Sequence, residues 1–378
     1  MPTHLLVTND YPPKVGGIQV YLHELWRRLP PGRATVLTAT SHEDAAAFDS
    51  STTVVIERSA HGLLFFPSLR VWRQIESAIS RHQPDLVVMD PAWPLGLLGP
   101  FLSRPFGVVL HGAEVTIPAR IPLVSSTLRF VLRRARVAIC AGSYPEAEAR
   151  RCAGDRLPPV VPVVPGVDCE RFVPRPPEDA PAVREALGLR PDAFLVSSYS
   201  RLVPRKGMDT LIRAAALLRH EIPELQVAIG GDGRDRPRLE RLARTLHAPV
   251  VFVGRVSDEI LPRWLAGSDV MAMACRNRWW GLEQEGFGIV FAEASACGIP
   301  VVAGRSGGSH DAVVDGVTGR IVNDPRNASE LAAILVDLYR HPATRRSMGE
   351  AGRRHALEAF DWSVLATQLD AGLQRFGG

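Results

Sequence analysis

The stretch Glu285-Gly-Phe-Gly-Ile-Val-Phe-Ala-Glu-Ala-Ser-Ala-Cys-Gly-Ile-Pro-Val-Val302 predicts a loop, a helix and a strand in succession. Gly286 and Gly288 free the backbone of the loop, and the apolar run after them predicts a helix that ends at Gly298. Glu285 would then lie at the helix start, where backbone N–H groups point toward a ligand. Glu293, about two helical turns further on, would face the same ligand. The alternative, two solvated glutamates on an exposed helix, does not need the two loop glycines.

Short apolar runs alternate with helical segments on both sides of this stretch, as is typical of parallel sheets. One set of strands is predicted at 4–7, 34–37, 86–89, 108–110 and 137–139, and a second at 195–199, 226–229, 250–253, 270–273, 300–302 and 319–322. A proline-rich passage at 158–177 separates the two sets. We therefore predict an α/β protein with two doubly wound Rossmann-like domains and a ligand cleft between them. The expected parts are 1–170, 171–360 and a C-terminal helix in 361–378 that crosses back to the first domain.

Composition narrows the classes of function. The 378 residues carry a net charge of +4 without a concentrated basic tract beside aromatic residues, so nucleic-acid binding has little support. No apolar run reaches membrane-spanning length and no signal peptide is evident, so we expect a cytoplasmic protein. The five cysteines contain no Cys-x-x-Cys pair, which indicates reduced thiols with neither a disulfide nor a zinc site.

Two glycine-containing loops hold Lys14 and Lys206, the only lysines among 44 basic residues. Gly16 and Gly17 follow the first strand and precede a helix expected over 20–29, so their backbone can approach a phosphate. Arg201 and Lys206 follow the first strand of the second domain, where they would stabilise a departing diphosphate. Ordinary strand-to-helix turns and surface ion pairs are the alternatives. Neither loop has the dinucleotide-binding or P-loop glycine pattern.

Together these features resemble the retaining GT-B glycosyltransferases of glycosyltransferase family 4, over nearly the whole chain. The motifs that carry the resemblance are Gly16-Gly17-Ile18, His111-Gly112-Ala113-Glu114, Ser200 to Gly207 and Glu285 to Gly298. The resemblance implies a nucleotide-sugar donor bound mainly by the second domain, with no cofactor and no essential metal. Asn9 to Pro13, Leu202 to Gly207 and Glu285 to Val290 are most similar to the actinobacterial phosphatidylinositol mannosyltransferases that add the second mannose. Those enzymes use GDP-mannose and a monomannosylated lipid acceptor.

The same resemblance implies roles for individual residues. Arg201 and Lys206 match the diphosphate-binding cations, and Gly16 and Gly17 match the glycine loop beside them. The donor ribose and base are matched by Glu293 and by Arg255 and Val256. The donor sugar is matched by the loop of Glu285, Gly286, Phe287 and Gly288. The expected catalytic residues are Glu285, His111, which matches a histidine near the C6 hydroxyl of the sugar, and Asp10, which matches an acidic position near the acceptor.

A retaining transfer is expected, in which the departing phosphate takes the acceptor proton and Glu285 orients the sugar. A lipid acceptor implies contact with the inner face of the plasma membrane. The helical segment 128–136 places Arg129, Arg133 and Arg136 near one face, and 63–66 supplies an apolar run, although a helix packed on its sheet with a solvated basic face explains the first pattern too. Trp279 and Trp280 would shape the sugar or acceptor pocket or pack the loop.

Three other functions remain open at this stage. One is a family 4 transferase that uses another nucleotide sugar and a soluble acceptor. The second is a GT-B sugar-nucleotide epimerase, which would release nucleotide without an acceptor. The third is a two-domain solute-binding protein, which the missing export signal and the paired cations disfavour.

Overall fold

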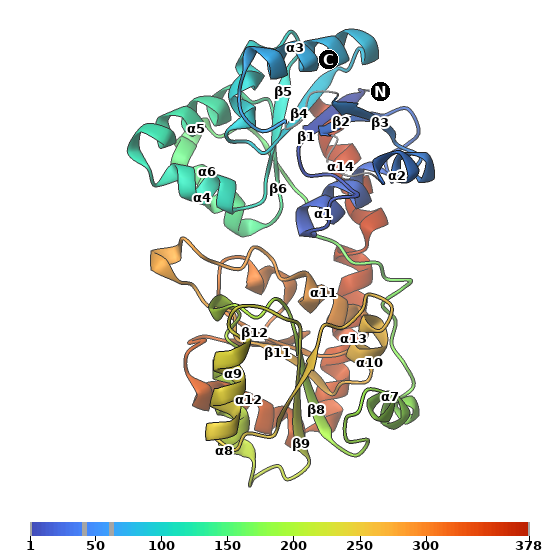
Figure 1. Ribbon diagram of the computed structural model, residues 1–378, viewed down its shortest axis with the longest axis vertical. Helices are drawn as coiled ribbons and strands as arrows, with labels where there is room; N and C mark the ends of the chain where they lie inside the picture. Colours follow the sequence, from blue (N-terminus) through green and yellow to red (C-terminus); the bar gives the residue numbers. More distant parts are fainter. Residues whose placement is uncertain (1, 40–43, 60–63, 377–378) are drawn as a thin grey trace. The chain divides into compact units, whose positions relative to one another are not determined.

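The chain forms two compact units, each built on one parallel sheet (Figure 1). The computed structural model describes residues 2–39, 44–59 and 64–376. Unit 1 comprises Met1–Pro165 and Trp362–Gly378, and unit 2 comprises Gly166–Asp361. The boundaries expected from sequence were after residues 170 and 360, whereas the two units divide after Pro165 and Asp361.

The sheet of unit 1 has seven strands in the order β3-β2-β1-β4-β5-β6-β7, all parallel. The strands are β1 (His4–Thr8), β2 (Ala34–Ala39), β3 (Val55–Ser59), β4 (Leu86–Asp90), β5 (Phe106–Leu110), β6 (Ala138–Cys140) and β7 (Val160–Pro162). The two edge strands, β3 and β7, were not predicted. One carries polar side chains and the other contains proline, which an edge strand tolerates because one side of it has no neighbour.

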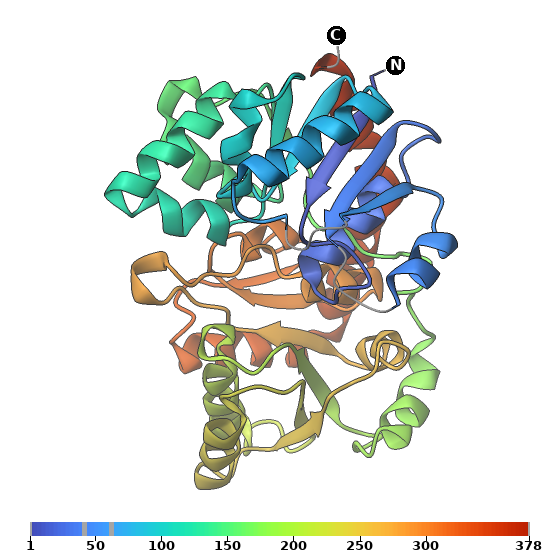
Figure 2. The same cartoon turned by 45° about the horizontal axis from the view of Figure 1, so that its top comes forward.

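Helices cover both faces of this sheet (Figures 1 and 2). They are α1 (Gly17–Trp26), α2 (Ala45–Ser51), α3 (Leu69–His82), α4 (Ala113–Ala119), α5 (Pro122–Arg134), α6 (Ser143–Ala153) and α14 (Trp362–Leu373), with 3-10 turns η1 (Leu95–Phe101), η2 (Gly154–Arg156) and η7 (Gln374–Phe376). The helix predicted at 20–29 begins earlier, at Gly17. The predicted C-terminal helix is α14, which packs against α1 within unit 1.

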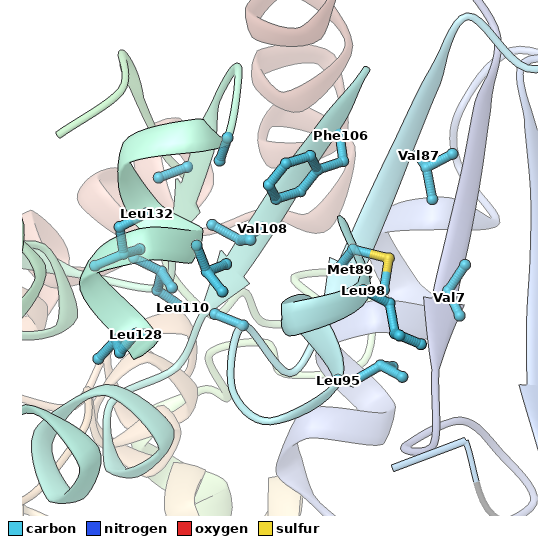
Figure 3. Close-up of a cluster of buried hydrophobic side chains, with 14 of the residues drawn as sticks. Val7, Val87, Met89, Leu95, Leu98, Phe106, Val108, Leu110, Leu128 and Leu132 are labelled. Carbon is cyan, nitrogen blue, oxygen red and sulfur yellow. The ribbon is translucent and has the colours of Figure 1, made fainter. Parts of the chain in front are cut away.

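The core of unit 1 lies on both sides of the sheet because the strands are buried on both faces. Along β4, Val87 and Met89 join one apolar cluster while Leu86 and Val88 join the other. Figure 3 shows the first cluster, in which side chains of β1, β4 and β5 meet those of η1 and α5, including Leu132. This packing fixes the carboxyl ends of the central strands.

The sheet of unit 2 has six parallel strands in the order β10-β9-β8-β11-β12-β13. They are β8 (Phe194–Tyr199), β9 (Leu225–Gly230), β10 (Val250–Gly254), β11 (Val270–Met273), β12 (Val301–Gly304) and β13 (Gly319–Val322), and sequence predicts all six. The helices are α7 (Ala180–Ala186), α8 (Met208–Leu218), α9 (Arg236–Thr245), α10 (Leu261–Ala266), α11 (Ile289–Ala296), α12 (Ala328–Arg340) and α13 (Pro342–Ala359), with 3-10 turns η3 (Pro177–Asp179), η4 (Pro204–Lys206), η5 (Trp279–Gly281) and η6 (Ser309–Ala312).

In each sheet the strand order reverses at one point, between β1 and β4 in unit 1 and between β8 and β11 in unit 2. Doubly wound sheets bind ligands outside the carboxyl ends of the strands at such a point. The loops there are those after β1, β4 and β5 in unit 1, and those after β8 and β11 in unit 2. All residues of the predicted site except Arg255 and Val256 lie in or directly beyond these loops. Arg255 and Val256 follow β10.

Candidate functional site

A buried carboxylate with two cations forms the centre of the unit 2 loops. Lys206 Nζ lies 2.7 Å from Glu285 Oε2, and Arg205 donates from Nη1 to the same oxygen. Both Lys206 and Glu285 are 8% exposed. A second carboxylate, that of Glu283, lies 4.0 Å from Arg205 Nε. Two residues predicted to meet one ligand therefore pair with each other.

Close backbone packing positions both partners. Lys206 ends the turn η4, and Gly207 after it adopts φ 69°, where a Cβ atom would come within 1.8 Å of the Ala274 carbonyl oxygen. On the other side, the Glu285 N–H donates to Ser306 Oγ at 3.2 Å. Gly307 adopts φ 52°, and a Cβ there would lie 2.1 Å from the Glu285 carbonyl oxygen. Only glycine fits either position, so the two loops hold the ion pair in place.

The charge state of Glu285 follows from this geometry. Burial alone would raise the pKa of its carboxyl, but Lys206 and Arg205 outweigh burial and hold that pKa below its ordinary value. The carboxylate is therefore ionised at neutral pH. Its negative charge offsets part of the positive charge that these two cations would present to an anionic ligand.

Arg201, the other predicted cation, is arranged differently. Its side chain is exposed, and among the described residues it has no hydrogen-bond or ion-pair partner. The loop 200–203 that carries it is held by the glycine loop after β9, since the Leu202 N–H donates to the Asp232 carbonyl at 2.8 Å. Arg201 is thus available to an anion at once, while Lys206 is available only after it leaves Glu285.

Glu293 lies in the predicted helix, α11, about one turn beyond its start at Ile289, because the helix begins four residues after Glu285. Its side chain is half-buried, and the structure gives its carboxylate no hydrogen-bond or ion-pair partner in the described ranges. Burial raises the pKa of Glu293 to about 7, with Arg171 acting in the opposite direction and Asp258 in the same one. The pKa of Glu285 is therefore lowered, whereas that of Glu293 is raised.

The remaining predicted residues of unit 2 lie in the glycine loop after Glu285 and in the loop after β10. Phe287 is buried against Phe360, with ring centroids 5.4 Å apart, and Gly286 and Gly288 flank it ahead of α11. Arg255 and Val256 follow β10, where the Arg255 guanidinium is exposed with Nε 3.8 Å from the Asp232 carboxylate. The Phe287 side chain therefore packs within unit 2.

The tryptophan pair forms a turn that projects from unit 2. Trp279 and Trp280 both adopt positive φ, 49° and 53°, and Trp280 is 97% exposed. The Arg278 guanidinium lies over the Trp279 ring and also pairs with Glu283 at 2.9 Å. Sequence left open whether the tryptophan pair shapes a pocket or packs the loop. Because Trp280 is almost fully exposed, the interpretation that it packs the loop is wrong.

In unit 1, the last residue of β4 and the first residue after β5 bring a buried acid and a histidine together. His111 Nε2 lies 2.8 Å from Asp90 Oδ1, and Thr8 Oγ1 donates to the other oxygen of Asp90 at 2.6 Å. Burial would lower the pKa of His111, but the Asp90 charge and hydrogen bond outweigh burial and raise it. The Tyr21 ring meets the imidazole edge-on at a centroid distance of 5.3 Å, so the ring orientation of His111 is fixed.

The loop after β1 holds Asp10, Gly16 and Gly17. Asp10 Oδ1 accepts from Lys14 Nζ at 2.5 Å and from Gln19 Nε2 at 2.6 Å. Gly17 begins α1, so this loop leads directly into a helix N-terminus, three residues before the predicted start at position 20. Lys14 therefore neutralises an acid of its own loop.

Sequence reasoning missed two members of these clusters, Arg205 and Asp90. Arg205 directly precedes Lys206 in the cationic loop, and Asp90 ends the strand beside β1, so each had a positional signal. Among the described residues, no group of three or more histidine, cysteine, aspartate and glutamate side chains is arranged to hold a metal ion.

Two family models match the chain, one in each half. Glycosyltransferase Family 4 matches residues 15–171, and Glycosyl transferases group 1 matches residues 179–355. Among solved structures, Anabaena Alr3699/HepE in complex with UDP has a TM-score of 0.81 at 22% identity, covering 99% of this chain and 100% of that one. Sucrose-phosphate synthase from Thermosynechococcus elongatus has a TM-score of 0.75 at 22% identity, covering 99% and 98%. These structures share the fold of this chain.

Sequence relatives are more similar. The GDP-mannose-dependent alpha-(1-6)-phosphatidylinositol monomannoside mannosyltransferase of Mycolicibacterium smegmatis is 37% identical over 97% of this chain and 96% of its own length. The GDP-mannose-dependent monoacylated alpha-(1-6)-phosphatidylinositol monomannoside mannosyltransferase of Corynebacterium glutamicum is 34% identical over 98% and 97%. The resemblance inferred from the motifs is therefore confirmed, and this chain belongs to the GT-B glycosyltransferases of family 4, in the group that contains these mannosyltransferases.

Proposed function

We propose that the protein transfers mannose from GDP-mannose to a phosphatidylinositol monomannoside, forming an α-1,6 linkage in the synthesis of cell-envelope glycolipids. The observation that carries this proposal is the 37% identity over 97% of the chain and 96% of the Mycolicibacterium relative. Identity of that extent includes both sheets, and hence the residues of unit 1 as well as those of unit 2. A shared donor module alone would leave one half of the chain unmatched.

The donor is bound by the unit 2 loops in this proposal. Arg201, which is exposed and unpaired in the described part of the chain, receives the diphosphate first. Lys206 then leaves Glu285 for the phosphate oxygens, and Arg205 remains with the carboxylate. Glu293 accepts hydrogen bonds from the ribose hydroxyls. Arg255 and Val256 meet the base.

The transfer retains the configuration of the anomeric carbon. The bond between that carbon and the β-phosphate oxygen breaks, and a bond to the acceptor hydroxyl oxygen forms on the same face of the sugar. The acceptor proton passes to the departing phosphate, so the products are GDP and the mannosylated lipid. Arg201 and Lys206 stabilise the charge that develops on the diphosphate. Glu285, with the N–H groups of Phe287 and Gly288, orients the mannose through its hydroxyl groups.

In this proposal, residues of unit 1 contact both the donor and the acceptor. His111 is held by Asp90 with one ring nitrogen occupied, which leaves the other nitrogen for the C6 hydroxyl of mannose. Asp10 would accept from the acceptor hydroxyl that is to be glycosylated, with Lys14 and Gln19 keeping its carboxylate in place. Gly16 and Gly17 let the backbone approach the donor phosphate.

A lipid acceptor requires the enzyme to work at a membrane surface, and we place it at the inner face of the plasma membrane. None of the helices in the described ranges is long and apolar enough to cross a bilayer. We propose peripheral contact with that surface, as the lipid acceptor requires.

The test is transfer of radiolabel from GDP-mannose into lipids extracted from an actinobacterial membrane. Wild-type protein should yield a labelled phosphatidylinositol dimannoside, and Glu285→Ala should yield none. Glu283→Ala, which removes a carboxylate from the same loop, is the matched control and should retain transfer. Digestion of the product with an α-mannosidase checks retention. An inverted anomer, or label that never enters lipid, would overturn the proposal.

A second candidate is transfer of a sugar to a soluble inositol phosphate. The D-inositol 3-phosphate glycosyltransferase of Kribbella flavida is 38% identical over 54% of this chain, although the match spans only 48% of that relative. Label that enters inositol 3-phosphate and not lipid would select this candidate. Nucleotide released without any acceptor would instead indicate the epimerase.

A further inference from the structure

The chain after β11 forms a short hairpin that carries the two neighbouring tryptophans of unit 2. Arg278 and Glu283 pair as an antiparallel bridge, with the Arg278 N–H donating to the Glu283 carbonyl at 2.9 Å and the Glu283 N–H donating back at 3.3 Å. Residues 279–282 form the turn between them, and we call 278–283 the tryptophan hairpin. Trp280 is 97% exposed, and no other aromatic side chain in the described ranges is as exposed.

The turn holds its tryptophans in a backbone conformation that favours glycine. Trp279 and Trp280 have φ angles of 49° and 53°, and Gly281 after them has a φ angle of 82°. A residue with a Cβ atom is strained in this left-handed region, and here two such residues follow each other. Packing compensates little of the strain at Trp280, because its side chain lies in solvent. Strain of this kind is concentrated at ligand-binding and active sites.

The tryptophan hairpin shares its supports with Glu285. Ser306 Oγ accepts from the Glu285 N–H at 3.2 Å and donates to Asn277 Oδ1 at 2.8 Å, directly before the first residue of the hairpin. The Asn277 carbonyl also accepts from Arg326 Nη2 at 3.2 Å. Because five residues of extended chain span at most about 18 Å, the backbone at Trp280 lies within that distance of Glu285. The indole is therefore within reach of a saccharide bound at the Glu285 carboxylate.

The chemistry of the hairpin fits a sugar ring. Its one cation, Arg278, lies over the Trp279 ring at 4.6 Å from the centroid and pairs through Nη1 with Glu283 Oε2 at 2.9 Å. An element that binds an anionic bilayer would instead place unpaired cations beside its aromatic side chains. A pyranose presents apolar C–H groups on one face and hydroxyl groups around its edge. A flat, exposed indole can cover the apolar face while the hydroxyl groups stay in water.

The segments that sequence offers for membrane contact belong to unit 1 and not to the tryptophan hairpin. Arg129 and Arg133 donate from Nε to the Cys152 and Ala153 carbonyls, so they hold the end of α6. The apolar run 63–66 begins at a residue outside the described ranges, and Leu64 in it is fully buried. Neither segment bears on the ligand of Trp280.

We propose that Trp280 stacks on the pyranose ring of the acceptor head group and thereby helps to select a mannosylated acceptor. This inference rests on the proposed function, because it takes the acceptor to be a monomannoside that meets the sugar oriented by Glu285. It adds a contact from unit 2 to the acceptor. Trp279, which is half-exposed beneath the Arg278 guanidinium, supports the turn from which Trp280 projects.

The experiment uses the water-soluble head group of the acceptor, a glycerophosphoinositol mannoside, which has the pyranose but no acyl chains. Trp280→Gly removes the indole and suits the positive φ, so the variant should unfold at a temperature no lower than that of the wild type. It should raise the KM for this acceptor about tenfold while the Kd of GDP stays unchanged. Trp280→Phe keeps a flat ring and should restore most of the lost affinity. Phe101→Ala removes another exposed aromatic side chain, in unit 1, and is the matched control.

A second measurement needs no transfer of sugar. In protein labelled with fluorotryptophan, the fluorine NMR resonance that is missing from Trp280→Phe belongs to Trp280, and it should shift when the head group is added with GDP. A resonance that does not move, or a normal KM in Trp280→Gly, would overturn the inference. So would a Trp280→Gly variant that is impaired only on vesicles with the intact lipid acceptor, since the indole would then meet the bilayer. A shift of the resonance in a wild-type protein that transfers no mannose would overturn the proposed function alone.

Discussion

Replacing Glu285 by glutamine should strengthen the binding of GDP while it weakens the transfer of mannose. Glu285 Oε2 lies 2.7 Å from Lys206 Nζ and also accepts from Arg205. A diphosphate must therefore compete with a protein carboxylate for Lys206. Glutamine keeps the size of the side chain and removes the competing charge.

The structure allows the size of this effect to be worked out. Coulomb's law gives about 6 kcal/mol for unit charges at the 2.7 Å separation of Lys206 and Glu285, with an effective dielectric constant of about 20. Desolvation of two buried ions cancels most of that energy, and a hydrogen bond between charged groups contributes about 1.5–3 kcal/mol net. Loss of the competition should therefore lower the Kd of GDP about tenfold or more.

Transfer should change in the opposite direction. The mannose would lose the carboxylate that orients its hydroxyl groups, so kcat/KM should fall by about two orders of magnitude. Isothermal titration calorimetry with GDP gives the first quantity, and transfer of radiolabelled mannose gives the second. The unliganded variant should also unfold at a lower temperature, because two buried cations lose their counter-charge, and excess GDP should restore part of that loss.

Glu283→Gln is the control for this experiment. Glu283 lies in the same loop, 4.0 Å from Arg205, but pairs with Arg278 at 2.9 Å. It should leave the affinity for GDP nearly unchanged. If GDP binds Glu285→Gln more weakly than the wild type, or equally well, then Glu285 does not compete with the diphosphate and the reasoning fails.

The remaining predictions concern charge in both units. The affinity for GDP should rise from about pH 6 to about pH 8 and then level off. The reason is that burial raises the pKa of Glu293 to about 7, and the ribose hydroxyls need the ionised carboxylate. Glu293→Gln should abolish this pH dependence in a series of GDP titrations. Arg201→Ala and Lys206→Ala should each reduce kcat/KM about hundredfold, and near-normal turnover in either would contradict a diphosphate role. Asp90→Asn removes the charge that raises the pKa of His111, so the ring should titrate at a lower pH in an NMR experiment; an unchanged titration would exclude Asp90 as the cause.

Much of the fold could be predicted because the central strands are buried on both faces. Five of the six strands of unit 2 contain a continuous apolar run, such as Val270–Met273, and all six were predicted, including the edge strand β13 with its Arg320. The edge strands β3 and β7 of unit 1 were missed. Their polar and proline residues are tolerated because an edge strand has a neighbouring strand on one side only. The position of a strand in the sheet cannot be predicted from its local sequence.

The candidate site could be predicted as a set of residues but not as a set of contacts. Glycine spacing indicates that Glu285 and Lys206 lie in ligand-facing loops, yet nothing local says that two side chains 79 positions apart neutralise each other. Asp90 was missed for the same reason, since its importance comes from His111 on the neighbouring strand. Pairing across a parallel sheet depends on strand order, which no single segment encodes.

The pKa values of Glu285 and Glu293 are shifted in opposite directions, so the two acids can have different roles in donor binding. Glu285 is kept ionised by two cations, whereas burial without a partner raises the pKa of Glu293 to about 7. Of these two acids, only Glu293 can then make donor binding depend on pH near neutrality. Glu285 needs a counter-charge both before and after a diphosphate takes Lys206. Arg205, which contacts the same carboxylate oxygen, can supply that charge after Lys206 has moved, so the proposed exchange never leaves a buried carboxylate unpaired.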